Sequence, residues 1–166
     1  YDIDGWICYS TKDLVNWKYE GEIMSAKDIS WATGSTSAWA AQTVKHNGKY
    51  YFYYCTWDAT SGNGQQSIGV AVSDSPTGPF KDLGKPVVSG KVTDFGTESS
   101  TWNDIDPTVL IEKDDKGEEH RYLAWGNGNY YICELNDDMI SVKDQNGDGK
   151  ITGGTSTKTA DVIQKT

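Results

Sequence analysis

The sequence predicts an all-β fold, and three observations lead to this prediction. Short runs of β-branched and aromatic residues recur between turns rich in Gly, Asn, Asp and Pro; helical periodicity is nearly absent; and one pattern of strands occurs more than once. The expected strands are residues 6–10, 43–46, 50–55, 67–72, 108–111, 122–125 and 130–133. Strands this short are typical of a sandwich, a barrel or a propeller.

The repeated pattern favours a β-propeller. Two strands joined by a Gly turn and followed by a third strand occur at residues 43–73 and again at 108–135. The third strand and the segment after it recur at residues 6–17. A four-stranded antiparallel unit that repeats in this way is typical of a propeller blade, whose first strand is innermost. We therefore expect about two and a half blades, namely the end of one at 1–25, a second at 38–90 and a third at 104–166.

The segments between the expected strands have the composition of turns and long connections. Asn47 and Gly48 separate two strands, and Asn-Gly adopts the positive φ angles of a tight β-hairpin. The connections at 25–37 and 89–102 are rich in Ser, Thr and Gly and are long for a compact domain. They are either solvated linkers or the walls of a pocket.

Composition and charge limit the classes of partner. The chain has 166 residues and a formal net charge of −9, with 15 Lys and Arg against 24 Asp and Glu. Phosphate contacts need a basic surface, so neither nucleic acid nor an anionic membrane is an expected partner, and no apolar stretch is long enough to cross a bilayer. Seven Trp and ten Tyr exceed what a core of this size needs, so some are candidate platforms for a neutral ligand such as a sugar.

The three cysteines give no metal or redox motif. Cys8, Cys55 and Cys133 lie in separate expected strands, and no Cys-x-x-Cys occurs. An odd number excludes complete pairing within the chain. We expect all three to be small apolar side chains of the interior.

Two carboxylates stand one residue apart just before the expected strand at 108–111. If the extended conformation begins early enough, its period of two directs Asp104 and Asp106 to the same side, and Pro107 stiffens the approach. Such a fixed carboxylate suits the mouth of a site. Alternatively, the Asp-Pro pair only opens a strand after a turn.

Four stretches together form a set known from one protein family. They are YSTKDLVNW at residues 9–17, AWAAQ and VKHNGKYYFYY within 38–54, IGVAVSDSPTGPF at 68–80, and IDPTV with YLAWG within 105–126. In this order they resemble the catalytic domain of glycoside hydrolase family 43, and the resemblance spans residues 6 to 140. It implies a five-bladed β-propeller that removes arabinofuranose or xylose from plant polysaccharides by hydrolysis with inversion.

The resemblance implies three acidic groups, of which one falls in this chain. They are an Asp general base, a Glu general acid and an Asp that orients the acid and tunes its pKa, and Asp106 matches the last of these. One carboxyl must stay protonated to donate to the leaving oxygen while another is ionised to activate water, and a third negative charge nearby raises the pKa of the donor. The base would precede Tyr1 and the acid would follow Thr166. This chemistry requires no cofactor.

Four further residues are candidate sugar contacts. Trp39 resembles the family residue that walls the subsite of the cleaved sugar, and a Trp of the propeller core is the alternative. Ala41 and Gln42 depart from the family pattern, which has Pro and an acid there, so a charged role at Gln42 is in doubt. Asn103 and Asp104 either reach sugar hydroxyls or cap the turn.

A separate signal at residues 144–151 resembles the first eight positions of an EF-hand calcium loop. Oxygen ligands occupy positions one, three and five, and Gly149 stands at six, where the loop turns sharply. Thr155 stands where the bidentate acid is expected, and no helix is predicted after it. The stretch is either a calcium site or a plain turn, in both cases within a surface insertion near 144–155. The candidate ligands are Asp144, Asn146, Asp148 and Lys150.

The hypothesis from the sequence is that this chain is part of a bacterial glycosidase that is secreted or lies in the cell envelope. It would hydrolyse arabinofuranosyl or xylosyl linkages in arabinoxylan, xylan or arabinan, and the remaining blades would come from the same or another chain. Two alternatives stay open. One is a non-catalytic carbohydrate-binding propeller, which the substitutions at Ala41 and Gln42 leave open. The other is a calcium-dependent interaction module centred on residues 144–155.

Overall fold

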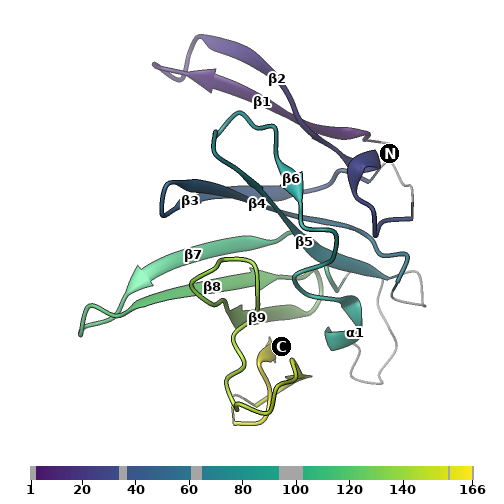
Figure 1. Ribbon diagram of the computed structural model, residues 1–166, viewed down its shortest axis with the longest axis vertical. Coiled ribbons are helices and arrows are strands. Elements are labelled where there is room, and N and C mark those ends of the chain that lie inside the picture. Colours follow the sequence, from purple (N-terminus) through teal and green to yellow (C-terminus); the bar gives the residue numbers. More distant parts are fainter. Residues whose placement is uncertain (1–2, 34–36, 61–64, 94–102, 157, 166) are drawn as a thin grey trace.

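The computed structural model describes residues 3–33, 37–60, 65–93, 103–156 and 158–165 (Figure 1). Its helical segments are short, α1 (Gly90–Thr93) and the 3-10 turn η1 (Ala26–Asp28). The all-β prediction is therefore confirmed. The strands are β1 (Gly5–Thr11), β2 (Trp17–Ser25), β3 (Ala41–His46), β4 (Lys49–Trp57), β5 (Gln66–Ser73), β6 (Lys81–Asp82), β7 (Thr108–Lys113), β8 (Glu119–Trp125), β9 (Tyr130–Glu134), β10 (Gly153–Gly154) and β11 (Val162–Lys165).

These strands form three sheets that follow one another down the long axis of the molecule (Figure 1). The first contains β1 and β2, the second has the order β3-β4-β5-β6, and the third has the order β10-β11-β9-β8-β7. Neighbouring strands are antiparallel except β10 and β11, which pair in parallel over two residues. The sheets lie inside the ranges 1–25, 38–90 and 104–166 expected for the blades, whose exact boundaries stay a prediction.

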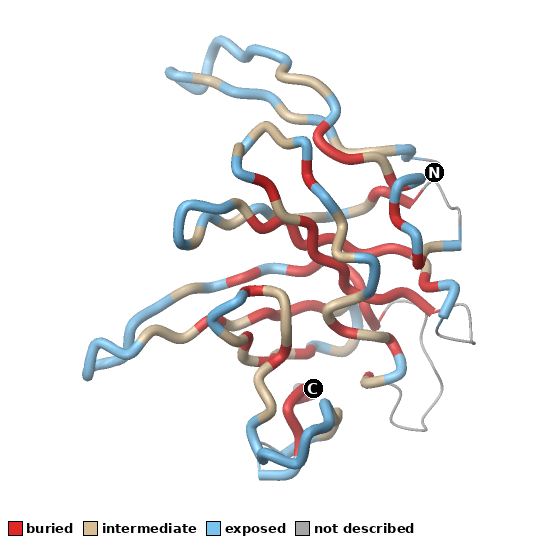
Figure 2. The backbone as a smooth tube through the Cα atoms, in the orientation of Figure 1, coloured by how far each residue is buried: buried red, intermediate tan, exposed pale blue. Residues whose placement is uncertain are grey.

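The middle sheet is buried on both faces. Along β4, alternate residues enter two different cores: Tyr53 and Cys55 pack toward the third sheet with Leu123, whereas Phe52 and Tyr54 pack toward the first sheet. A strand covered on both sides needs apolar residues at successive positions, as the run from Tyr50 to Cys55 provides. Figure 2 shows this burial concentrated in the central strands, whereas the β1–β2 ribbon and the hairpin tips are exposed.

Gly69 in β5 allows the close packing of the middle sheet. It pairs with Tyr54, and a Cβ atom at this position would lie 2.3 Å from Cζ of the Tyr54 ring, which is fully buried. We expect Gly69→Ala to lower the free energy of unfolding by about 2–3 kcal/mol, because overpacking forces a buried ring to move. Urea denaturation would measure this, and an unchanged midpoint would show that the ring has room to shift.

The first strands of the second and third sheets bring two predicted site segments together. The turn between β3 and β4 has φ angles of 46° at Asn47 and 81° at Gly48, which confirms the predicted hairpin. β3 and β7 contact each other at their sheet edges. Near the start of both strands, the Gln42 side chain of β3 accepts a hydrogen bond from the Val109 amide of β7. The segments that immediately precede the two strands therefore lie at the same end of the molecule.

No helix among the described residues is both long and apolar enough to cross a membrane.

Candidate functional site

The turn before β7 presents one of the two predicted carboxylates to solvent. Asp106 is exposed and has a φ of 59°, in the left-handed region that non-glycine residues rarely adopt. β7 begins only at Thr108. The expectation that Asp104 and Asp106 point to the same side is wrong, because the backbone between them is a turn and not a strand: Asp104 is buried and Asp106 is exposed.

Asp104 is tied into the interior by both oxygens. Its Oδ1 accepts a hydrogen bond from Trp125 Nε1 at 2.8 Å, and its Oδ2 lies 2.6 Å from the Thr93 hydroxyl of α1. Burial raises the pKa of Asp104 to about 6, against the two hydrogen bonds that lower it. With 3% of its surface exposed, Asp104 could contact a sugar only if one of these bonds opened. Its role as a sugar contact stays a prediction.

The residues on either side of Asp104 are fixed as well. Asn103 is buried, and its Oδ1 accepts a hydrogen bond from Asn129 Nδ2 at 2.9 Å. The Ile105 carbonyl accepts a hydrogen bond from the Gly126 amide at 2.8 Å. Gly126 has a φ of 117°, and a Cβ atom there would lie 2.1 Å from the Asn129 carbonyl oxygen, so only glycine fits. The end of β8 thus holds the turn that leads to Asp106.

Cys55 links the turn to the segment before β3. Its thiol lies 3.8 Å from the Ala40 carbonyl and hydrogen-bonds with the backbone of Asp106. Burial raises the pKa of Cys55 to about 12, so the thiol is protonated near neutral pH and is not a nucleophile. Cys55 and Cys133 are buried, Cys8 is partly buried, and all three are free thiols. The expected interior position is therefore found for Cys55 and Cys133, whereas Cys8 is only partly buried.

Gln42 joins the inner strands of two sheets. Its Oε1 accepts hydrogen bonds from the Val109 amide at 2.5 Å and from the Thr108 hydroxyl at 3.0 Å. An acid at this position, as in the family pattern, would also accept both. The uncharged Gln42 side chain therefore has at least a structural function, and its contact with a sugar stays a prediction.

Trp39 lies two residues before β3 and is half-buried. Its ring packs edge-on against Trp57 with centroids 6.4 Å apart, and its carbonyl accepts a hydrogen bond from Trp6 Nε1 at 2.7 Å. Part of the ring belongs to the core between the second and third sheets. A half-buried indole is compatible with both sequence interpretations, a core residue and the wall of a sugar subsite.

The predicted calcium loop is a series of side-chain-capped turns. Asp144 accepts hydrogen bonds from the Gly147 and Gly149 amides, both at 2.7 Å, and these backbone bonds, with that of Gly149 first, lower the pKa of Asp144. Asn146 and Asp148 each accept an amide two residues further on, at 3.0 and 2.8 Å. Each of these oxygens retains a second lone pair, so the donor set is compatible with a hard cation.

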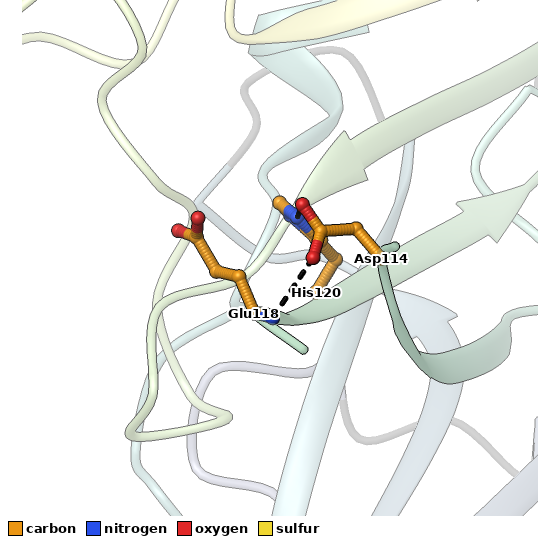
Figure 3. A group of neighbouring side chains, drawn as sticks. All are labelled: Asp114, Glu118 and His120. Atoms are coloured by element: carbon orange, nitrogen blue, oxygen red, sulfur yellow. Dashed lines mark hydrogen bonds and ion pairs between the residues drawn. The ribbon is translucent and has the colours of Figure 1, made fainter. Parts of the chain in front are cut away.

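A second group of ligand-type side chains lies on the hairpin between β7 and β8. The ligand atoms of Asp114, Glu118 and His120 are all within 4.8 Å of one another (Figure 3). Asp114 closes its own turn by accepting the Glu118 amide at 2.8 Å, and His120 Nδ1 lies 3.0 Å from Glu134 Oε1, a bond that raises the pKa of His120. The turn and the ion pair explain why these three side chains lie close together. The group lies at the opposite end of β7 from Asp106.

Sequence reasoning did not find the residues that support the site. Thr93, Cys55 and Gly126 surround the Asp106 turn, but each comes from a different element. Trp125 and Gly126 belong to the sequence motif YLAWG, but the motif does not indicate their contacts. Of the two long connections expected to line a pocket, residues 34–36 and 94–102 lie outside the described part of the chain, so that expectation stays untested.

Comparison with known proteins identifies the family. The model of the glycosyl hydrolases family 43 matches residues 1–162. The chain is 31% identical over 150 residues to an extracellular endo-α-(1→5)-L-arabinanase of Thermotoga petrophila, covering 75% of the chain and 31% of that protein. It is 29% identical over 143 residues to an extracellular exo-α-(1→5)-L-arabinofuranosidase of Cellvibrio japonicus, covering 79% and 38%.

Solved structures agree with this assignment. An α-L-arabinofuranosidase from Clostridium thermocellum superimposes with a TM-score of 0.66 at 40% identity, over 86% of this chain and 44% of that one. A β-xylosidase/α-arabinofuranosidase from a compost metagenome, in complex with xylotriose and in a calcium-free form, gives 0.65 at 27% identity, over 86% and 47%. The chain thus spans about a third of the curated relatives and under half of the solved chains. The resemblance seen in the sequence is confirmed: the chain belongs to the glycosyl hydrolases of family 43 and has part of their β-propeller fold.

Proposed function

We propose that this chain is part of an inverting glycoside hydrolase that cleaves arabinofuranosyl or xylosyl linkages in plant polysaccharides such as arabinan, xylan or arabinoxylan. The observation that supports this best is the exposed Asp106 carboxylate. Asp106 has a left-handed backbone conformation two residues before β7, and the start of β7 lies beside the start of β3. The relatives are named as arabinanases, arabinofuranosidases and xylosidases, which agrees with this substrate class.

In this proposal Asp106 supplies a fixed negative charge next to the proton donor. A neighbouring negative charge disfavours ionisation of the donor, which keeps it protonated at the pH of the reaction, and the carboxylate also orients it. A second, ionised carboxylate activates the attacking water on the opposite face of the sugar. Both the donor and the base come from parts of the propeller outside residues 1–166. The step itself requires no cofactor.

The sugar would bind against residues on both sides of the Asp106 turn. We assign to Trp39 the wall of the subsite, because an indole face suits the apolar face of a sugar ring. Asn103 and Gln42 supply polar groups near the start of β7, although both already have structural partners. Asp104 would reach a sugar hydroxyl only after a rearrangement of its buried contacts.

Further blades would pack on the free face of the third sheet. Leu110 and Tyr130 are 56% and 48% exposed, and with Tyr122 and Ile132 they line a hollow of about 320 Å³ on this face. The equivalent face of the middle sheet is covered by the third sheet. Because a propeller typically has four to eight blades, a further sheet of the same or another chain is the expected cover.

The configuration of the first product tests the reaction class. When the complete protein hydrolyses an aryl α-L-arabinofuranoside, proton NMR of the initial product should show the β-anomer, because single displacement inverts the anomeric carbon. An initial α-anomer would contradict inversion. No turnover of arabinofuranosides, xylosides or their oligosaccharides, with retained binding, would instead support the non-catalytic carbohydrate-binding propeller.

We further propose that the loop at residues 144–155 binds calcium outside the catalytic site, with Asp144, Asn146, Asp148 and the Lys150 carbonyl as ligands. Without an acid at Thr155 the affinity should be low, with a Kd of about 10⁻⁴–10⁻³ M. Isothermal titration with CaCl₂ should detect binding that Asp148→Asn weakens at least about tenfold. Asp115→Asn, at an exposed position of another turn, is the matched control. Equal heats of CaCl₂ titration for the parent protein, Asp148→Asn and Asp115→Asn would show that the loop is only a turn.

Two of the relatives are named as extracellular enzymes, which supports secretion of this protein as well. We propose a secreted or cell-envelope location in a bacterium, where a plant polysaccharide would be accessible.

A further inference from the structure

The Thr93 hydroxyl stands between two acceptors and has one hydrogen to give. Its Oγ1 lies 2.6 Å from Asp104 Oδ2 and 3.0 Å from the Gly90 carbonyl oxygen. A hydroxyl donates one hydrogen bond, so it cannot donate to both. If Asp104 carries the proton, the carboxyl donates to Thr93 Oγ1, Thr93 donates to Gly90, and both contacts are satisfied.

The same carboxyl fixes the end of β8 from its other oxygen. Oδ1 accepts the indole hydrogen of Trp125 at 2.8 Å, and Trp125 is followed by Gly126, whose amide donates to the Ile105 carbonyl. Asp104 therefore connects α1 to the end of β8, and the chain continues from it through one residue to Asp106. The Asp106 carboxylate itself has no hydrogen bond to a described residue, so its position depends on this backbone.

We propose that Asp104 is a positioning residue: bonded to Trp125 and Thr93, it holds the turn that presents Asp106 to the substrate. This rests on the function proposed for Asp106. A displacement of about 1 Å in a catalytic group can lower the rate about a hundredfold, so an anchor of this kind affects the rate without touching the sugar. The titratable side chains that interact with Asp104 from the neighbouring strands are Cys55 and Tyr131; both have a pKa raised by burial to about 12 and stay neutral.

The test is a set of variants of the complete protein, assayed at pH 5 on an aryl arabinofuranoside or xyloside. Asp104→Ala should lower kcat about 100-fold with KM changed less than about twofold. The substitution releases the turn but leaves the contacts that bind the substrate in the ground state unchanged. Asp104→Asn should retain kcat within about threefold, since its oxygen accepts from Trp125 and its amide donates to Thr93 as the protonated acid does. Thr93→Val, a milder change, should lower kcat about tenfold and replaces Asp104→Ala if that variant does not fold.

A matched control separates positioning from stability. Asp82 in β6 also accepts an indole hydrogen, from Trp31, and a hydroxyl hydrogen, from Tyr54, but it lies on the outermost strand of the middle sheet. Asp82→Ala should lower the melting temperature and leave kcat of the folded protein unchanged. If Asp104→Ala behaves like Asp82→Ala, the proposal is wrong.

A double-variant cycle tests whether Asp104 acts through Asp106. Adding Asp104→Ala to Asp106→Ala should cause less than about a threefold further loss, because the group being positioned is already absent. Full additivity of the two losses would overturn the proposal. If Asp106→Ala alone retains activity, the proposed function fails; if it is inactive while Asp104→Ala has a normal kcat, only the positioning role fails.

Discussion

Asp106→Asn should lower kcat of the complete protein about 1,000-fold on aryl arabinofuranosides or xylosides while the fold stays intact. The loss follows from the proposed role, because an amide neither holds a negative charge beside the proton donor nor keeps that donor protonated, and acid–base assistance contributes about 10²–10⁴ in rate. The fold should persist because Asp106 is exposed and Asn tolerates the left-handed backbone found there, at a φ of 59°.

The control for this variant is Asp115→Asn, which removes one carboxylate from an exposed position on the β7–β8 turn of the same sheet. It should leave kcat unchanged. Circular dichroism and the melting temperature of both variants should match those of the parent protein. A kcat for Asp106→Asn within tenfold of the parent would show that Asp106 does not have the proposed catalytic role.

Asp104→Asn should stabilise the protein above pH 6 relative to the parent. The folded-state pKa of Asp104 is raised from 3.8 to about 6, so its favourable contribution is fully present below pH 3.8 and is lost as the pH rises through about 6. A tenfold change in an ionisation equilibrium corresponds to about 1.4 kcal/mol, so the parent loses about 3 kcal/mol of stability that a variant with an amide retains. The difference between variant and parent should therefore grow from pH 3.8 to pH 6 and then stay constant.

Urea denaturation at a series of pH values measures this difference directly. The substituted amide reproduces the bonds of the protonated acid to Trp125 and Thr93, so the two proteins should be similar in stability at pH 4. A variant that is less stable than the parent at pH 8 would show that the ionised carboxylate is the form the fold requires.

Much of the fold could be predicted because its signals are local. The continuous apolar and aromatic run of β4 marks a strand buried on both faces, and Asn47-Gly48 specifies the hairpin that joins it to β3. The repeated pattern of strands then predicted several sheets of the same kind, as in the blades of a propeller. The parallel pairing of β10 with β11 was not predicted, because β10 has only two residues and therefore no periodicity to detect.

The site was predictable only in part, because its geometry depends on residues far apart in the sequence. The motif around Pro107 pointed to Asp106, but the alternation of a strand placed Asp104 on the wrong side. Asp104 is buried because Trp125 and Thr93, from β8 and α1, supply hydrogen bonds that compensate for the loss of solvent. No local pattern contains this information, because the sequence around Asp104 and Asp106 is compatible with both a turn and the beginning of a strand.

The most direct test of the central claim is a crystal structure of the complete protein with an arabino- or xylo-oligosaccharide bound. The account predicts that a carboxylate oxygen of Asp106 lies within hydrogen-bond distance, about 2.6–3.2 Å, of the sugar or of the carboxyl that donates the proton. An oligosaccharide bound in a productive position with Asp106 facing only solvent would contradict it.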